Sequence, residues 1–162
     1  MANKNTDDII MSALQYILPG QPYNTRLASI GGAILIQQEY KLSQGKFPAV
    51  HIEVGRQKHT IQGNNVYDAT MQFMITYYDR WDQAIVSIDQ IRATINADLQ
   101  IMMSNVQANS SLTVGNTNHA TAVCDYELSP YKGELDDKTV PGLTLVKRVL
   151  TIDVNVLPYD VF

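Results

Sequence analysis

Three histidines and one cysteine are the first candidates for catalysis or metal binding in this 162-residue chain. His51, His59 and His119 do not have the spacing at which two histidines share a metal ion. Cys124 falls on the expected inner face of a strand, where a thiol behaves as a small apolar side chain rather than a nucleophile. We therefore expect ordinary surface roles for the histidines, with His51 on the solvent face of a strand, and a core role for the cysteine.

Two acids, Asp79 and Asp82, flank an Arg80-Trp81 pair directly after a predicted strand. Loops at strand ends often carry function, so two carboxylates there suggest a general acid-base pair. The alternative is structural, because acids between a strand and a helix stabilise the helix N-terminus. No histidine or second acidic cluster is placed to complete a catalytic site, and we favour the structural interpretation.

Two further stretches fail to match a known binding loop. Glu134, Asp136 and Asp137 form an acidic run without the regular oxygen spacing and closing glutamate of a calcium loop. Gly31-Gly32 lacks the additional glycines and the lysine of a phosphate-binding loop. We expect no catalytic residue, no metal site and no cofactor, and we interpret the chain as a protein that is not an enzyme.

The nine tyrosines and one tryptophan are more informative than the titratable residues. Several aromatics lie outside the predicted core stripes, and such residues are enriched where one protein packs on another. Alternatively, large rings simply cover the ends of a small core, and the sequence favours neither interpretation. The aromatics concerned are Tyr23, Tyr40, Tyr67, Tyr78, Trp81, Tyr131 and Tyr159.

Composition and charge exclude several classes of protein. The net charge of −4 and the scattered lysines and arginines argue against nucleic acid as the main partner, since phosphate binding requires a clustered basic face. A single cysteine allows no internal disulfide and suits a reducing compartment. The longest apolar run, residues 33–36, is far shorter than the roughly 20 residues that a membrane helix needs.

Two amphipathic helices are predicted from apolar spacing. The first covers residues 7–18, with Thr6 as the N-cap and Pro19-Gly20 as the end. The second covers residues 84–103 and has the most regular stripe in the chain. Its apolar residues recur at intervals of four and three, and they are Ala84, Ile88, Ile91, Ile95, Leu99 and Met102.

The predicted strands alternate apolar and polar residues, as strands buried on one face do. Residues 48–54 and 69–78 form an antiparallel hairpin whose long polar tip covers 55–68. Residues 119–128 and 146–156 form a second pair, and 33–38 form one more strand. The chain is thus expected to be a single α+β domain over residues 1–162, with a mixed or antiparallel β-sheet, helices packed on one face and long hairpin loops.

The segment 129–142 between the last two strands is far longer than a hairpin needs. It combines an aromatic with charges of both signs, so we predict a contact arm that orders on meeting another subunit. The alternative is a solvated, dispensable loop. The candidate contact residues are Tyr78, Trp81, Tyr131, Lys132, Glu134, Asp136, Asp137 and Lys138.

The order of these elements resembles the tail terminator and neck proteins of long-tailed bacteriophages. The features that carry the resemblance are the opening helix, the phrase FPAVHIEV at residues 47–54, a strand ending in aromatics and acids, a long helix, and two closing strands separated by a polar loop. The resemblance is one of pattern rather than of a diagnostic motif.

This resemblance implies a structural virion subunit, a homo-oligomeric and commonly hexameric ring that caps the tail tube and joins it to the head connector. Its partners would be copies of itself, the tail tube protein and the head connector or neck proteins, with no nucleic acid recognised directly and no membrane. Its location would be the tail or neck of the virion, assembled in the host cytoplasm. The alternatives are another neck, head-completion or minor tail protein, and a small ferredoxin-like ligand-binding domain or enzyme.

Overall fold

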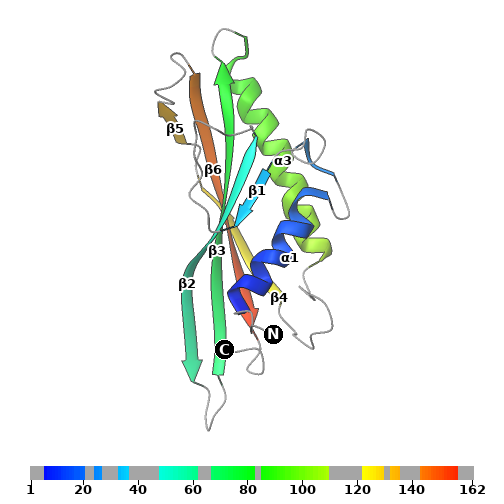
Figure 1. The fold of residues 1–162 in the computed structure, drawn as a ribbon, viewed down its shortest axis with the longest axis vertical. Helices are drawn as coiled ribbons and strands as arrows, with labels where there is room; N and C mark the ends of the chain where they lie inside the picture. The colour runs from blue at the N-terminus through cyan, green and yellow to red at the C-terminus, as the bar shows by residue number, and fades with distance from the viewer. Residues whose placement is uncertain are drawn as a thin grey trace.

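Two helices and six strands make up the part of the chain that the structure, a computed structural model, describes (Figure 1). The described residues are 6–20, 24–26, 33–36, 48–61, 67–82, 85–109, 122–129, 132–135 and 143–156. The elements are α1 (Thr6–Gly20), β1 (Ala33–Ile36), β2 (Ala49–Ile61), β3 (Tyr67–Asp82), α3 (Ile88–Ala108), β4 (Ala122–Leu128), β5 (Lys132–Leu135) and β6 (Leu143–Val156).

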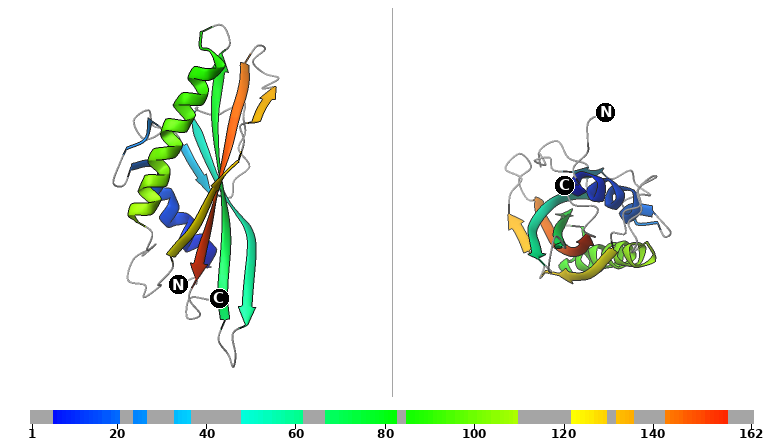
Figure 2. Two further views of the ribbon diagram at one scale, coloured as in Figure 1. Left: turned by 180° about the vertical axis from the view of Figure 1, so that it is seen from behind. Right: turned by 90° about the horizontal axis from the view of Figure 1, so that it is seen from below.

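The six strands form one sheet with the order β1-β2-β3-β6-β4, and β5 pairs with β6 beside β4. All pairings are antiparallel except β1 with β2, which is parallel. The sheet is strongly twisted and curls around the two helices, which both cover the same face (Figure 2). The predicted α+β class, with a mixed sheet and helices on one face, is therefore confirmed.

Helix α3 begins where a capping box satisfies its first backbone N–H groups. The Ser87 hydroxyl accepts a hydrogen bond from the Gln90 backbone N–H at 3.3 Å, and the Ser87 backbone N–H donates to Gln90 Oε1 at 3.0 Å. The predicted start at residue 84 was therefore too early, and the helix also runs past residue 103 to Ala108. The predicted stripe is confirmed at Ile91, Ile95, Leu99 and Met102, all of which are buried.

Helix α1 packs against α3 as well as against the sheet. The predicted stripe is buried at Ile10, Leu14 and Ile17, and the helix ends at Gly20, as predicted, with Pro19 inside its last turn. The buried Asn105 of α3 donates from Nδ2 to the Leu18 backbone oxygen at 3.1 Å, so it satisfies a carbonyl that the end of α1 leaves without a helical partner.

The β2–β3 hairpin is longer than its sequence predicted. β2 continues to Ile61 and β3 begins at Tyr67, so most of the predicted polar tip at 55–68 is strand. A β-bulge interrupts the pairing, since Gly55 and Arg56 together lie opposite Gln72. A Cβ on Gly55 would lie 2.9 Å from Gln72 Oε1 and 3.3 Å from the Gln72 backbone oxygen, so glycine suits this close approach.

The segment 129–142 also has more structure than predicted. Residues 132–135 form β5, which pairs with residues 144–147 of β6 within the same chain. The prediction of an arm that orders only on meeting a partner is therefore wrong for this stretch. The physical reason is that β4 pairs only with residues 150–155 on one side of β6. β5 pairs with residues 144–147 on that side, so the backbone groups of this part of the edge find partners within the chain.

One continuous core fills the space between the sheet and the helices. Alternate residues of β2, β3 and β6 face α1 and α3, and they are fully buried at Ile52, Phe73, Ile75, Leu150 and Ile152. The hairpin formed by β2 and β3 continues past the lower end of α1, where no helix covers it (Figure 1).

Candidate functional site

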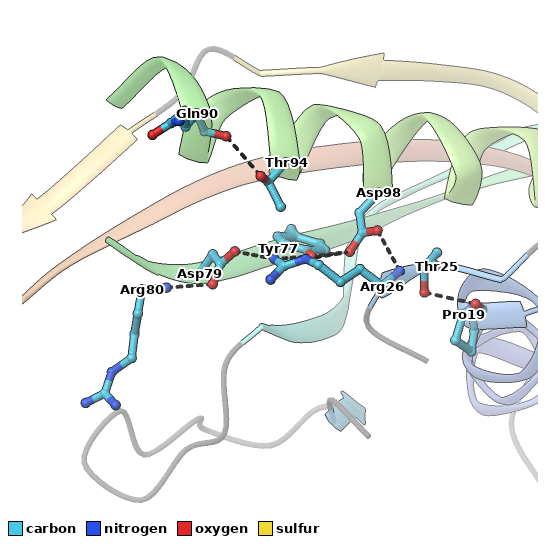
Figure 3. Close-up of polar contacts among 9 residues, drawn as sticks. All are labelled: Pro19, Thr25, Arg26, Tyr77, Asp79, Arg80, Gln90, Thr94 and Asp98. Atoms are coloured by element: carbon cyan, nitrogen blue, oxygen red, sulfur yellow. Dashed lines mark hydrogen bonds and ion pairs between the residues drawn. The ribbon is translucent and has the colours of Figure 1, made fainter. Parts of the chain in front are cut away.

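Four side chains form a polar cluster inside this apolar core: Arg26, Tyr77 of β3, Asp79 of β3 and Asp98 of α3 (Figure 3). We call it the buried polar cluster. Tyr77, Asp79 and Asp98 are buried, whereas Arg26 remains partly exposed. The cluster joins three parts of the chain that are distant in sequence.

Hydrogen bonds connect all four members of the buried polar cluster. The Arg26 backbone N–H donates to Asp98 Oδ1 at 2.8 Å, and the Tyr77 hydroxyl donates to Asp98 Oδ2. The Arg26 guanidinium pairs with Asp79 Oδ2 through Nη2 and donates to the Tyr77 hydroxyl oxygen at 3.4 Å. The second oxygen of Asp79 accepts from the Arg80 backbone N–H at 2.8 Å.

Burial and charge act in opposite directions on these groups. Burial raises the pKa of Asp79 above its ordinary value, and the positive charge of Arg26 only partly offsets that rise. Burial and the hydrogen bond to Asp98 raise the pKa of Tyr77, so this phenol stays protonated and acts as a donor. Burial lowers the pKa of Arg26, but Asp79 and Tyr77 outweigh it and the net pKa is raised.

Both carboxylates of the cluster are occupied by protein donors, which gives the cluster a structural role. It fixes residues 24–26 against α3 and β3, and the Thr25 hydroxyl and backbone N–H extend this connection to the Pro19 oxygen at 2.9 and 2.8 Å. Such a network specifies one arrangement of the elements around it because each buried polar atom needs its partner.

The predicted interpretation of Asp79 and Asp82 as acids between a strand and a helix was wrong. Asp79 lies inside β3 and Asp82 is its last residue, while Ser87 rather than an acid caps α3. Asp79 is buried and pairs with Arg26, a residue that the sequence did not single out. The sequence did hold a signal for Asp98, since this acid lies between Ile95 and Met102 on the buried face of α3.

His51 differs from its predicted place on a solvent face. Its side chain is half-buried, and Nε2 is buried with no hydrogen-bond partner in the described part of the chain. It lies opposite Thr76, which is buried although it points away from the helices. The centre of the outer sheet face is therefore less accessible than its alternating sequence predicted.

The four described candidate contact residues, Tyr78, Trp81, Lys132 and Glu134, lie at the same end of the sheet, where Tyr78 and Lys132 both pair with Lys147 of β6. Tyr78 is half-buried on the outer face of β3, in register with Lys147. Trp81 packs against the core, and its indole Nε1 donates to the Val86 backbone oxygen at 2.8 Å. Lys132 and Glu134 lie in β5, while Tyr131, Asp136, Asp137 and Lys138 lie outside the described residues. Their role in contacts stays a prediction.

Four stretches of sheet edge lack a partner strand within the described residues, and they belong to β1, β2, β4 and β5. The two longest are those of β2 and β4. β1 pairs with residues 49–52 of β2, and no described strand pairs with the outer edge of β2 from residue 53 to residue 61. β4 pairs with β6 on one side, and its other side has no described partner strand. An open edge presents a row of backbone donors and acceptors to any extended chain. We call these two edges the β2 edge, residues 55–61, and the β4 edge, residues 122–128.

The described residues contain no group of three or more His, Cys, Asp or Glu side chains that could hold a metal ion. Neither of their two helices is long and apolar enough to cross a membrane.

Comparison with known proteins gives a distant structural likeness. No protein-family model matches the sequence, and no curated protein matches it. Among solved structures, the chain is similar to a chain from the virion of a native gene transfer agent particle, with 11% sequence identity and a TM-score of 0.43. The match covers 94% of this chain and 99% of that chain. A likeness this weak carries no argument about function, which has to rest on the geometry above.

Proposed function

We propose that this chain is a structural subunit of a phage-like virion and that it works by assembling with copies of itself. The observation that carries the proposal is the pair of open edges at the two sides of one long sheet. The far end of β2 and the start of β3 extend past the lower end of α1 (Figure 1). Open edges are usually blocked or covered in a protein that remains a monomer.

The specific role we propose is that of the tail terminator, a ring that caps the tail tube and faces the head connector. The support is the order of elements, since the opening helix, the strand pair, the long helix and the closing strands are all present in the expected sequence. A ring of identical subunits, expected to be a hexamer, is compatible with two different edges that could each contact a different neighbour.

The proposal is tested first by the mass of the purified chain in solution. Sedimentation velocity over a wide concentration range should show a discrete oligomer, and negative-stain electron microscopy should show closed rings. A chain that remains a monomer throughout, and that binds a metabolite instead, would favour the alternative of a small ligand-binding domain or enzyme.

The specific role is tested in the particle-producing genome that encodes the chain. Deleting its coding sequence should give tails of uncontrolled length that do not join heads, because nothing stops polymerisation of the tube. Tails of normal length that remain unattached would indicate another neck protein. Normal, complete particles would contradict both roles.

A further inference from the structure

We propose that copies of this chain join edge to edge, with the β2 edge of one copy pairing antiparallel with the β4 edge of the next. This inference rests on the proposed function, since it specifies how the self-assembly occurs. It uses residues 55–61 of β2 and residues 122–128 of β4, which have the same length. The joint would continue the sheet from one subunit into its neighbour.

Strand direction supports this joint. β2, β3, β6 and β4 are consecutive neighbours, and every pair among them is antiparallel, so β2 and β4 run in opposite directions. When copies are related by rotation about an axis to which the strands are tilted by less than a right angle, β4 of one copy meets β2 of the next in the antiparallel sense. The alternation therefore continues across the joint without any strand being reversed.

Both edges also lie in the same half of the molecule. Lys58 of β2 pairs with Thr70, Thr70 with Asn155, and Asn155 with Ala122 of β4. The two edges are thus the opposite sides of one four-stranded region. The parallel strand β1 and the added strand β5 both pair outside these edges, with residues 49–52 of β2 and 144–147 of β6.

Charge indicates which edges pair. The β2 edge carries Arg56 and Lys58, both exposed, and no acid. The β4 edge carries Asp125 and Glu127 and no base, and Glu127 is exposed. Two β2 edges or two β4 edges would place like charges together, whereas β2 with β4 brings opposite charges together. The charges therefore favour a head-to-tail joint over a two-fold dimer, and a head-to-tail joint is the kind that closes into rings.

One register matches both charge pairs at the same time. In antiparallel pairing, placing Lys58 opposite Asp125 also places Arg56 opposite Glu127, Gly55 opposite Leu128 and Ile61 opposite Ala122. Within one copy, Lys58 and Ala122 lie in the same row across the sheet. In the proposed register Lys58 lies opposite Asp125 of the next copy instead of Ala122, so neighbouring copies are displaced along the strands. Such a step is expected of strands that tilt relative to the axis of a closed ring.

Charge reversal tests the joint. The first variant carries Arg56→Glu and Lys58→Glu, and the second carries Asp125→Lys and Glu127→Lys. Each variant alone places like charges at every joint, so each should sediment as a monomer at concentrations where the parent assembles. Mixing the two variants pairs opposite charges at every joint and should restore the oligomer. Circular dichroism and thermal unfolding confirm that each variant is folded.

The matched control is a charge change of similar size on exposed residues of α3, Arg92→Glu with Gln100→Glu, which should leave assembly unchanged. Parent and reversed variants that assemble equally well would overturn the edge joint while leaving self-assembly intact. A mixture of folded variants that remains monomeric would also overturn it. A parent chain that never assembles would overturn the proposed self-assembly and the joint together.

Disulfide trapping tests the register. In a Cys124→Ala background, Lys58→Cys with Asp125→Cys should give covalent oligomers under mild oxidation, because paired strand residues lie within disulfide reach. β3 and β6 separate these positions within one copy, so any bond formed must join two copies. Arg56→Cys with Asp125→Cys is the out-of-register control and should cross-link far less. Equal cross-linking of both pairs would contradict the register.

Discussion

The buried polar cluster shows how single residues determine the arrangement of this core. Asp98 accepts hydrogen bonds from Arg26 and Tyr77, while Asp79 pairs with the Arg26 guanidinium. A buried carboxylate is costly unless donors surround it, so these residues depend on one another. The raised pKa of Asp79 indicates that its donors do not fully offset the cost of burial.

We therefore expect a pH-dependent difference between the parent and the Asp79→Asn variant. A raised folded-state pKa means that the folded chain holds this proton more tightly than the unfolded chain. The free energy of unfolding of the parent should then fall, relative to the variant, as pH rises above about 4, where an ordinary aspartate ionises. Urea titrations between pH 3.5 and 7 measure this difference. A parent that instead gains stability relative to the variant over this range would contradict it.

At the scale of elements, α3 and α1 both bury apolar side chains on the helical side of the core. Ile95 of α3 is fully buried against the sheet, while Ile85, just before the helix, is 78% exposed. The Ile95→Ala substitution should lower the free energy of unfolding by about 2 to 5 kcal/mol, because it removes buried methyl groups and leaves a cavity.

Urea titration at neutral pH measures this loss, with Ile85→Ala as the matched control. An exposed isoleucine contributes little, so the control should change stability by less than about 0.5 kcal/mol. Similar effects at the two positions would mean that the stripe of α3 is not the buried face.

The start of α3 provides a second test at this scale. Removing the Ser87 hydroxyl leaves the Gln90 backbone N–H without its cap, so Ser87→Ala should cost about 0.5 to 2 kcal/mol. Ser104 is the control, because its hydroxyl donates to the Gln100 oxygen within the helix. Serine that bonds back to its own helix slightly destabilises it, so Ser104→Ala should be neutral or stabilising in the same thermal unfolding measurement. Equal losses at the two serines would contradict the capping box.

At the scale of the whole molecule, β6 organises the sheet. It pairs with β3 along its whole length on one side, while β5 and β4 pair with its two halves on the other. Between those two strands, the Ser129 backbone N–H donates to the Val149 oxygen at 2.9 Å, and the Val149 N–H donates to the Ser129 hydroxyl at 3.0 Å. Both edges of β6 are therefore covered.

Hydrogen exchange should reflect this arrangement. Backbone amides of residues 146–154 should exchange most slowly, because they open only when the sheet separates, and those of residues 55–61 should exchange faster in the monomer. Mass spectrometry of exchanged peptides measures both segments. Exchange at the β2 edge as slow as that of β6 in a monomeric sample would contradict the assignment of an open edge.

Local patterns in the sequence were sufficient for much of the fold. Alternation over residues 146–156 and the four-and-three spacing over Ile91, Ile95, Leu99 and Met102 reflect which side of each element faces apolar surroundings, and that depends only on neighbours along the chain. The α+β class, the helices on one face and the antiparallel pairings of β2 with β3 and of β4 with β6 follow from such patterns. Polar composition misled the prediction at residues 55–61, since an uncovered strand has no apolar face to reveal it.

Only the tertiary structure decided which distant groups meet. The cluster brings together Arg26, the β3 residues Tyr77 and Asp79, and Asp98 from three distant places in the sequence, and no local period connects these places. Likewise, the basic and acidic edges become opposite sides of one sheet only once β3 and β6 lie between them. Strand order depends on the packing of the whole chain, so only the fold places the charges at residues 56–58 and 125–127 on opposite edges of one sheet.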